Sequence, residues 1–278
     1  MALLDGQWSY GGLTFGAGTD IRVLSLPVGV RDFVARSAST IRPRDHGSFV
    51  GDAWVGSKEP QIELMAMTRA AEIAVEEVFA PGGDLAALSF KFQGRVQQRV
   101  YARPTRWARP HTREADGVGR ATVMMAWEQP DPRVFSEEEH STGIVLSSQT
   151  GGMEFPVTFP LTFGSGGAGT GLILNAGNFG ARPIVTITGG EVVGPRLEHV
   201  GRDESIRLPG FTLPAGSTLS VDFDARTVLL GAVSRYSYLS TDSVWWQLDP
   251  GSNEIRFSSL SGDPAVTATV TWRDAWLP

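Results

Sequence analysis

The sequence predicts a mainly β protein with one substantial helix, and three observations support this expectation. The 278 residues include 33 glycines and 17 prolines, a content typical of many turns and few long helices. Several short segments alternate apolar and polar side chains, as half-buried strands do. Only one substantial segment spaces its apolar residues as a helix does. We therefore expect an N-terminal β-sandwich or barrel-like domain with one helix, followed by a C-terminal β-sandwich of jelly-roll type.

Short strands and the helix fill the first half of the chain. Residues 21–26 predict a strand that ends at Pro27, and a second strand alternates Ile62, Leu64 and Ala66 with Glu63 and Met65. The period then changes to that of a helix, which Pro81-Gly82-Gly83 ends. The helix is expected to bury Met67, Ala71, Ala74, Val75 and Val78 and to expose Arg69, Glu72, Glu76 and Glu77.

A hairpin and a further strand precede a predicted domain boundary. Residues 88–92 and 96–101 flank Gln93-Gly94-Arg95, which favours a hairpin turn, and residues 121–127 predict the next strand. Two prolines in residues 127–136 interrupt regular structure, and the acidic run that follows is expected to be solvated. That run is Glu137-Glu138-Glu139-His140. We therefore expect two domains, residues 1–134 and residues 135–278.

The second half of the chain consists of strands and turns. Residues 184–188, 219–224 and 227–230 alternate cleanly, and turn sequences such as Pro214-Ala215-Gly216-Ser217 separate them. In the last strand, one face holds Val266, Ala268, Val270 and Trp272. This pattern is typical of a β-sandwich.

Charge differs between the halves. Residues 1–134 carry 16 basic and 15 acidic residues, a balance of +1, whereas residues 135–278 carry 8 and 15, a balance of −7. Copies of the acidic half should repel one another, whereas the first half lacks this barrier to association. Neither half has the strong basic excess of a nucleic-acid-binding protein.

Composition also excludes several classes of protein. There are no cysteines, so disulfides and thiolate metal sites are excluded. The first residues lack a basic and apolar leader, and no run of about 18 apolar residues spans a bilayer. We therefore expect a soluble protein made in the cytoplasm.

Several motifs of the chain recur together in one known family. Asn175 to Gly189 reads N-x-G-N-x-x-A-x-P followed by a strand, and Trp246 to Ile255 reads W-x-L-x-P-G-x-N-x-I. The chain closes on Arg273-Asp274-Ala275-Trp276, and residues 151–156 read G-G-x-x-F-P. Together with the stretch 127–136, these motifs resemble the distal tail protein of long, non-contractile-tailed bacteriophages, the siphoviruses.

The resemblance implies a structural, non-enzymatic virion protein at the distal end of the tail. Residues 1–134 would form a hexameric ring that docks on the tail tube, and residues 135–278 would form a galectin-like sandwich outside the ring. The implied partners are further copies of this chain, the tail tube protein, the tape measure protein, the tail-tip hub or tail-associated protein and a receptor-binding protein. DNA would only pass through the lumen, membrane insertion is not implied, and synthesis would take place in the host cytoplasm. The alternative is a carbohydrate-binding module that recognises glycans of the host cell envelope.

No catalytic, cofactor-binding or metal-binding residue is predicted. Gly164 to Gly169 matches G-x-G-x-x-G by letter, but residues 172–175 after it predict a strand, whereas a dinucleotide site needs a helix there. The phosphate-loop motif G-K-[ST] is absent. The four histidines are scattered, so local hydrogen bonding is favoured over metal ligation; they are His46, His111, His140 and His199.

Three further groups each have a functional and a structural interpretation. Asp222 and Asp224 could share a strand face near a bound sugar, although a solvated face is favoured. Trp245 and Trp246 should face opposite ways in a strand, one in the core and one available for a sugar, a loop or a partner. A series of arginines with interleaved aromatics could bind nucleic acid, but the small net charge favours contacts with ring neighbours or the tube. This series comprises Arg95, Arg99, Arg103, Arg106, Arg109 and Arg113 with Tyr101 and Trp107.

Overall fold

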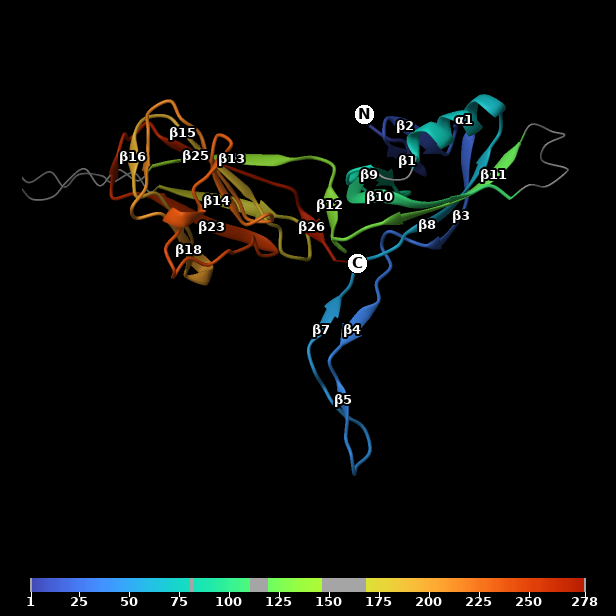
Figure 1. Ribbon diagram of the computed structural model, residues 1–278, viewed down its shortest axis with the longest axis horizontal. Helices are drawn as coiled ribbons and strands as arrows, with labels where there is room; N and C mark the ends of the chain where they lie inside the picture. Colours follow the sequence, from blue (N-terminus) through green and yellow to red (C-terminus); the bar gives the residue numbers. More distant parts are fainter. Residues whose placement is uncertain (1, 81–82, 111–119, 147–168, 278) are drawn as a thin grey trace, which may run out of the picture. The chain divides into compact units, whose positions relative to one another are not determined.

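A computed structural model describes residues 2–80, 83–110, 120–146 and 169–277, which separate into two units. The first unit contains the chain up to Glu137 together with Trp276 and Leu277, and the second runs from Glu138 to Ala275. Strands dominate both units, and the described residues hold a single α-helix (Figure 1). The expected mainly β class is confirmed. Within the described residues, no helix has both the length and the apolar character needed to cross a membrane.

One open sheet organises the N-terminal unit, in the order β2-β1-β9-β10-β11-β8-β3. Its longest strand, β10, joins two halves of the sheet, because residues 98–102 pair with β9 and residues 103–108 pair with β11. The short strand β12 also pairs with β10. The bounds are β1 (Gln7–Tyr10), β2 (Leu13–Gly16), β3 (Ile21–Val28), β8 (Gln61–Ala66), β9 (Ala86–Lys91), β10 (Gln98–Ala108), β11 (Ala121–Glu128) and β12 (Val134–Ser136).

Aromatic side chains form the centre of the N-terminal core. Phe79 stacks on Tyr10 with ring centroids 5.2 Å apart and meets the edge of Trp127 at 5.5 Å. Trp8 packs against Phe90 at 5.1 Å. Each of these large side chains contributes roughly 1.5–3 kcal/mol by leaving water. Trp276, at the far end of the sequence, also packs against this core.

Helix α1 (Arg69–Val78) confirms the predicted helix and begins at a side-chain cap. The amide of Ala71 donates to the Thr68 hydroxyl at 3.2 Å. The helix buries Ala71 and Val75 as expected, but Glu72 is also buried, against the prediction. Its carboxylate is held by the guanidinium groups of Arg69 and Arg109, which supply the opposite charge that a buried carboxylate requires.

One expectation about prolines is wrong. Strand β3 does not end at Pro27 but continues to Val28. It is the last strand of the sheet, where a missing amide donor is tolerated, and its register shifts between Ser25 and Val28. The interruption expected around Pro130 and Pro132 is present, since no strand covers residues 130–133.

Strands on both sides of the prolines and local ion pairs hold residues 127–137 in place. The Asp131 carboxylate accepts from the Arg133 amide at 3.0 Å, and β12 follows directly. Glu137 is not freely solvated, since it accepts from Ser89 at 2.8 Å and pairs with Arg99. The neighbouring hairpin is as predicted, with β9 paired to β10 and a turn in which the Arg95 amide donates to the carbonyl of Phe92 at 3.1 Å.

The C-terminal unit contains two larger sheets and one small one. The sheet β13-β25-β15-β20-β21-β22 and the sheet β14-β23-β17-β18 enclose an apolar core, and β19-β16-β24 closes one end of it. The predicted strands at residues 184–188, 219–224 and 227–230 correspond to β15, β20 and β21, and β25 buries Ala268, Val270 and Trp272 as expected.

The bounds in this unit follow the chain. They are β13 (His140–Val145), β14 (Thr170–Asn175), β15 (Ile184–Thr188), β16 (Val192–Val193), β17 (Arg196–His199), β18 (Glu204–Arg207), β19 (Thr212–Leu213), β20 (Leu219–Asp222), β21 (Thr227–Leu230), β22 (Val233–Ser234), β23 (Gly251–Ser258), β24 (Ser261–Gly262) and β25 (Thr267–Trp272). The last strand, β26 (Ala275–Trp276), instead pairs with β12 of the N-terminal sheet.

Candidate functional site

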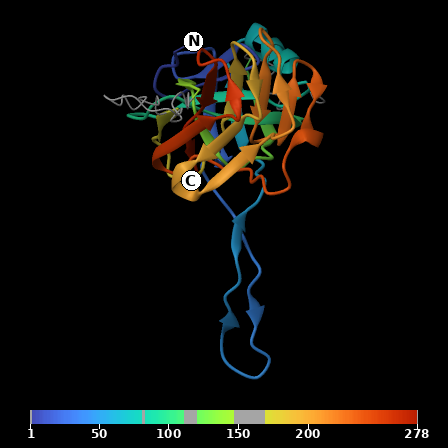
Figure 2. The ribbon, with the colours of Figure 1, turned by 90° about the vertical axis from the view of Figure 1, so that its left-hand side faces the viewer.

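A two-stranded arm, residues 33–55, projects from the N-terminal unit (Figures 1 and 2). β4 (Ala35–Ser37) pairs with β7 (Ala53–Val55), and farther out β5 (Thr40–Ile41) pairs with β6 (Ser48–Phe49). At the tip, the Arg42 amide donates to the carbonyl of Gly47 at 3.2 Å. Eleven residues of extended chain reach about 35 Å.

The arm carries large apolar side chains that are exposed to solvent and therefore do not stabilise the hairpin itself. Every residue from 32 to 50 is exposed. A two-stranded hairpin alone is marginally stable in water, and exposed apolar surface of this kind marks an interaction site. The large exposed apolar residues are Phe33, Val34, Ile41, Phe49, Val50 and Trp54.

Polar contacts brace the root of the arm. The Lys58 ammonium donates to the carbonyl of Val30 at 3.2 Å, which joins the two chain segments where the arm begins and ends. The backbone of Lys58 exchanges two hydrogen bonds of 2.9 Å with that of Gln129. Arg31 donates to the side chain of Gln98 at 2.7 Å. The body of the unit therefore holds the base of the arm in place.

Burying the charged ammonium group of Lys58 at this position is unfavourable for folding. Its side chain is buried, and desolvation lowers its pKa from 10.5 to about 8, although the carboxylates of Asp32 and Asp131 oppose the shift. Neither the arm nor this lysine was predicted from the sequence. A usable signal was present, because Arg42 to Gly47 has turn composition and lies between the apolar residues Ile41 and Phe49.

The predicted arginine series is divided between internal pairs and exposed positions. Arg99 pairs with Glu137, Arg103 pairs with Glu128 and Arg109 pairs with Glu72, all within the N-terminal unit. Arg95 and Arg106 are exposed, and Arg113 lies outside the described residues. Tyr101 packs on Phe135 at 5.8 Å, and Trp107 packs against the core. Contacts of this series with neighbours or the tube therefore stay a prediction for Arg95 and Arg106.

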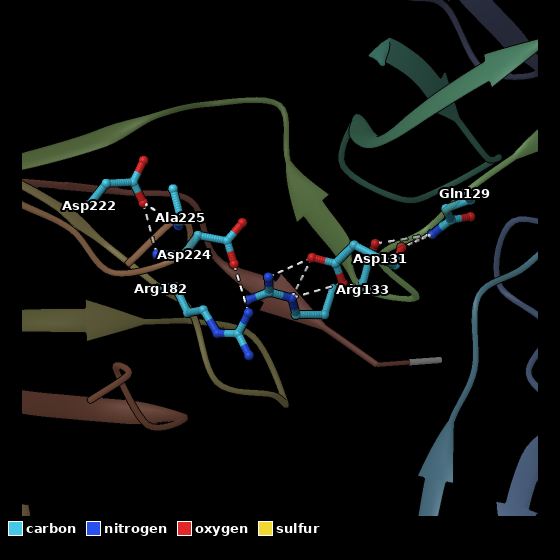
Figure 3. Close-up of polar contacts among 7 residues, drawn as sticks. All are labelled: Gln129, Asp131, Arg133, Arg182, Asp222, Asp224 and Ala225. Atoms are coloured by element: carbon cyan, nitrogen blue, oxygen red, sulfur yellow. Dashed lines mark hydrogen bonds and ion pairs between the residues drawn. The ribbon is translucent and has the colours of Figure 1, made fainter. Parts of the chain in front are cut away.

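The carboxylates Asp222 and Asp224 do not form a pair on a strand (Figure 3). β20 ends at Asp222, whose carboxylate accepts from the amides of Asp224 and Ala225 at 2.8 and 2.9 Å. Asp224 instead pairs with Arg182 at 2.7 Å. The first carboxylate therefore fixes a turn, and the second makes an exposed ion pair. Figure 3 also shows the Asp131–Arg133 pair and the Gln129 amide that donates to the carbonyl of Asp131 at 2.7 Å.

Three of the four histidines lie in the described part of the chain, and their contacts there are local. His199 is buried, hydrogen bonds to Asn253 at 2.8 Å and packs against Trp246 at 5.7 Å. His140 lies 3.4 Å from Asp274, and His46 is exposed at the tip of the arm. His111 is outside the described part of the chain. Among the residues that the structure describes, no group of three or more His, Asp or Glu side chains is arranged to hold a metal ion.

Trp245 and Trp246 point to opposite environments as predicted, but they do not lie in a strand. Trp246 is buried against Phe223 at 4.1 Å. Trp245 is half-buried, with Tyr236 stacked on it at 6.4 Å and the edge of Phe223 at 5.6 Å. Sugar binding at Trp245 stays a prediction.

The sequence motifs map onto a buried polar network. The Asn175 side chain donates to the carbonyls of Phe179 and Leu248 at 2.8 and 3.1 Å and accepts from the Gly177 amide at 3.1 Å. Asp274 accepts from the Ala176 amide at 3.0 Å. Gly177 is required here, because a Cβ would lie 1.8 Å from the carbonyl oxygen of Ala275. The N-x-G-N and R-D-A-W motifs therefore specify one structural joint.

Asn253 of the Pro-Gly-Ser-Asn segment has an equivalent role. Its side-chain oxygen accepts from the Asp249 amide at 2.7 Å, and its amide group donates to the carbonyls of Asp249 and Gly251 at 2.8 and 3.0 Å. The G-G-x-x-F-P motif at residues 151–156 lies outside the described residues, as do residues 164–168 of the glycine-rich motif. Residues 172–175, after that motif, form part of β14 as predicted.

Comparison with known families agrees with these motifs. Residues 176–276 match the family described as the siphovirus-type tail component, C-terminal domain. The predicted resemblance to phage distal tail proteins is therefore confirmed. The comparison with curated protein sequences gave no match.

Solved phage structures share the fold. The SPP1 Dit (gp 19.1) protein, described as a paradigm of the hub adsorption apparatus in phages infecting Gram-positive bacteria, has a TM-score of 0.68 at 10% identity, over 98% of this chain and 99% of that chain. Chains of the phage P2 baseplate in its activated conformation with Ca and with Sr have TM-scores of 0.52 and 0.53 at 8% and 9% identity. Each covers 95% of this chain and 97% of the baseplate chain.

Proposed function

We propose that this chain is a non-enzymatic structural protein that forms a hexameric ring at the distal end of a siphovirus tail. The ring joins the tail tube to the tail-tip or baseplate proteins that carry host recognition. Residues 1–134 supply the ring and dock on the tube, and residues 135–278 form the domain carried outside it. Tape measure, hub and receptor-binding proteins are its further partners, and DNA passes through the lumen without being gripped.

The observation that carries this proposal is the family match over residues 176–276. Its motif residues occupy a buried structural joint, so they indicate a scaffold. The shared fold over nearly the whole length of a phage hub protein adds support.

The arm supports assembly in a more specific way. Its exposed apolar residues need a partner to leave water, and its braced root would transmit that contact to the body of the N-terminal unit. In a ring built from this unit, we expect the arm to pack on the adjacent copy.

A triple substitution tests the contribution of the arm. Ile41→Ser, Phe49→Ser and Trp54→Ser remove exposed side chains, so the monomer should stay folded with an unchanged circular dichroism spectrum. Sedimentation velocity should show loss of the ring, because the apolar contact between copies is gone. A matched control changes Leu172 and Leu174, also exposed but in the C-terminal unit, to serine and should leave the ring intact. Normal assembly of the triple variant would reject the role given to the arm.

A further inference from the structure

A cavity of about 280 Å³ in the C-terminal unit has two arginines and no carboxylate in its lining. Arg196 on β17 and Arg207 on β18 lie directly opposite each other across the antiparallel pair. Ser258 and Ser259, at the end of β23, provide hydroxyl groups beside them. Leu260 and Pro209 add apolar surface. The cavity therefore combines cationic, hydroxyl and apolar groups in a small volume.

Backbone hydrogen bonds hold the walls of this cavity. The Gly194 amide donates to the carbonyl of Phe211 at 2.8 Å, and the Leu260 amide donates to that of Val193 at 3.0 Å. Gly194 has a φ of +61°, and a Cβ at this position would lie 2.8 Å from the Leu260 side chain. Glycine is therefore needed for this wall to form. The cavity is built by the fold of the C-terminal unit itself.

Arg196 lacks full compensation within the described residues. Like charges directly opposite on neighbouring strands are destabilising. The Nε of Arg196 is buried without a hydrogen-bond partner in the described chain. Glu198, which lies 3.2 Å from Arg196, is shared with Arg256 at 3.8 Å.

The second arginine is compensated from outside the cavity. Arg207 donates to the Ser205 hydroxyl at 2.9 Å and to Asp242 at 2.8 Å. Asp242 is exposed and does not line the cavity. The Ser240 hydroxyl lowers the pKa of Asp242, and the charges of Arg207 and Arg196 lower it further, which indicates a positive potential here. An anion between the two guanidinium groups would relieve their repulsion.

We propose that this cavity binds an acidic sugar, with its carboxylate or phosphate group between Arg196 and Arg207. Guanidinium groups suit both anions, because their N–H groups form a planar fork. The volume is close to the lower limit for small-molecule sites, roughly 300 Å³, and accommodates a single sugar unit. Ser258 and Ser259 face the sugar hydroxyls, and Leu260 and Pro209 face its C–H surface.

We favour a sugar over an acidic peptide because the backbone groups at the edge of β18 are already hydrogen-bonded. Extended peptides often bind by adding a strand to a free sheet edge. Here the carbonyl of Arg207 already accepts from the Ser240 amide at 2.9 Å, and the carbonyl of Ser205 accepts from Val244 at 3.0 Å. This edge of the sheet is therefore occupied by the chain's own backbone.

Calorimetric titration of the full chain tests the proposal with four probes: glucuronate, glucose 6-phosphate, glucose and inorganic phosphate. The two acidic sugars should bind at least tenfold more tightly than glucose, and glucose 6-phosphate more tightly than phosphate. Binding should weaken with salt. Arg196→Gln and Arg207→Gln should each lower the affinity for glucuronate at least tenfold. Arg256 lies on the neighbouring strand β23 and does not line the cavity, so Arg256→Gln should change the affinity for glucuronate less than twofold.

Four results would overturn the proposal. In the first, neither acidic sugar binds at millimolar concentration, and in the second, glucose binds as tightly as glucuronate. In the third, the Arg196, Arg207 and Arg256 variants lose the same affinity for glucuronate. In the fourth, phosphate binds as tightly as glucose 6-phosphate. A glutamate-rich peptide that binds more tightly than both acidic sugars would reassign the site to a protein partner. The probe series on the unmodified chain decides the question even where a variant fails to fold. The outcome is independent of ring formation.

Discussion

At the scale of residues, buried polar side chains hold the C-terminal joint together. Asn175, Asn253 and Asp274 are all buried, and each satisfies backbone groups that regular strands leave unpaired. A buried amide without a partner costs about 1–3 kcal/mol, so these positions tolerate few other side chains. The sequence motifs are thus explained by hydrogen-bond satisfaction at particular backbone atoms.

Asn253→Ala should lower the free energy of unfolding by about 2–4 kcal/mol, because it removes several buried hydrogen bonds and leaves the Asp249 amide and His199 without their partner. Urea unfolding of the full chain measures this loss. Ser252→Ala, at the exposed neighbouring position, serves as the control and should change stability by less than about 0.5 kcal/mol. A loss of equal size in both variants would contradict the role given to Asn253.

The lowered pKa of Lys58 predicts how the stability of the fold depends on pH. The folded chain lowers its pKa from 10.5 to about 8, so the ammonium opposes folding below pH 8 and stability rises as the pH increases from about 8 towards 10.5. Between pH 7 and 9.5 this contribution amounts to about 2 kcal/mol. Urea unfolding at both pH values should show the rise in the wild type.

The two lysines of the chain give a matched pair of variants for this measurement. Lys58→Met should abolish most of the rise and be more stable than the wild type at pH 7, because the cost of burying the charge disappears. Lys91→Met should retain the rise, since Lys58 is intact. A rise of the same size in Lys58→Met would show that another group titrates in this range.

At the scale of elements, local patterns predict the strands and the helix well. Strands such as β8 and β25 have one buried face, and the alternation of their side chains reveals it directly. The errors occur where a distant residue changes the environment. Glu72 is buried because Arg109, on another segment of the chain, pairs with it, and β3 passes through Pro27 because it is an edge strand. No local pattern contains this information.

The arm was missed for a related reason. Its strands are short and exposed on both faces, so they lack the alternation that marks a half-buried strand. The carboxylate-free cavity lined by Arg196 and Arg207 could not be predicted from the sequence either, because cross-strand register places these residues opposite each other. Register is set by the fold of the whole unit.

The contact between α1 and the end of β10 can be tested by substitution. Arg109→Met should destabilise the chain by about 2–4 kcal/mol, because Glu72 loses one of its two cationic partners while buried. Arg103→Met removes an exposed pair with Glu128 and should cost less than about 1 kcal/mol. Thermal and urea unfolding of both variants provide the comparison. Equal costs would mean that burial does not decide the value of these ion pairs.

At the scale of the whole molecule, two β units joined in one chain share the fold of phage hub and baseplate proteins. The motifs predicted this relationship from the sequence because they occupy the buried joint of the second unit. The contacts that build an assembly lie on the surface, where the motifs give no information. The proposed ring therefore rests on the tail-component match and on the apolar arm of the first unit.

Cryo-electron microscopy of the tail tip that contains this protein tests the central claim most directly. We predict a layer of sixfold symmetry with one copy of the chain per repeat, the N-terminal units around the lumen and the C-terminal units at the periphery. Three- or fivefold symmetry in this layer would contradict the account.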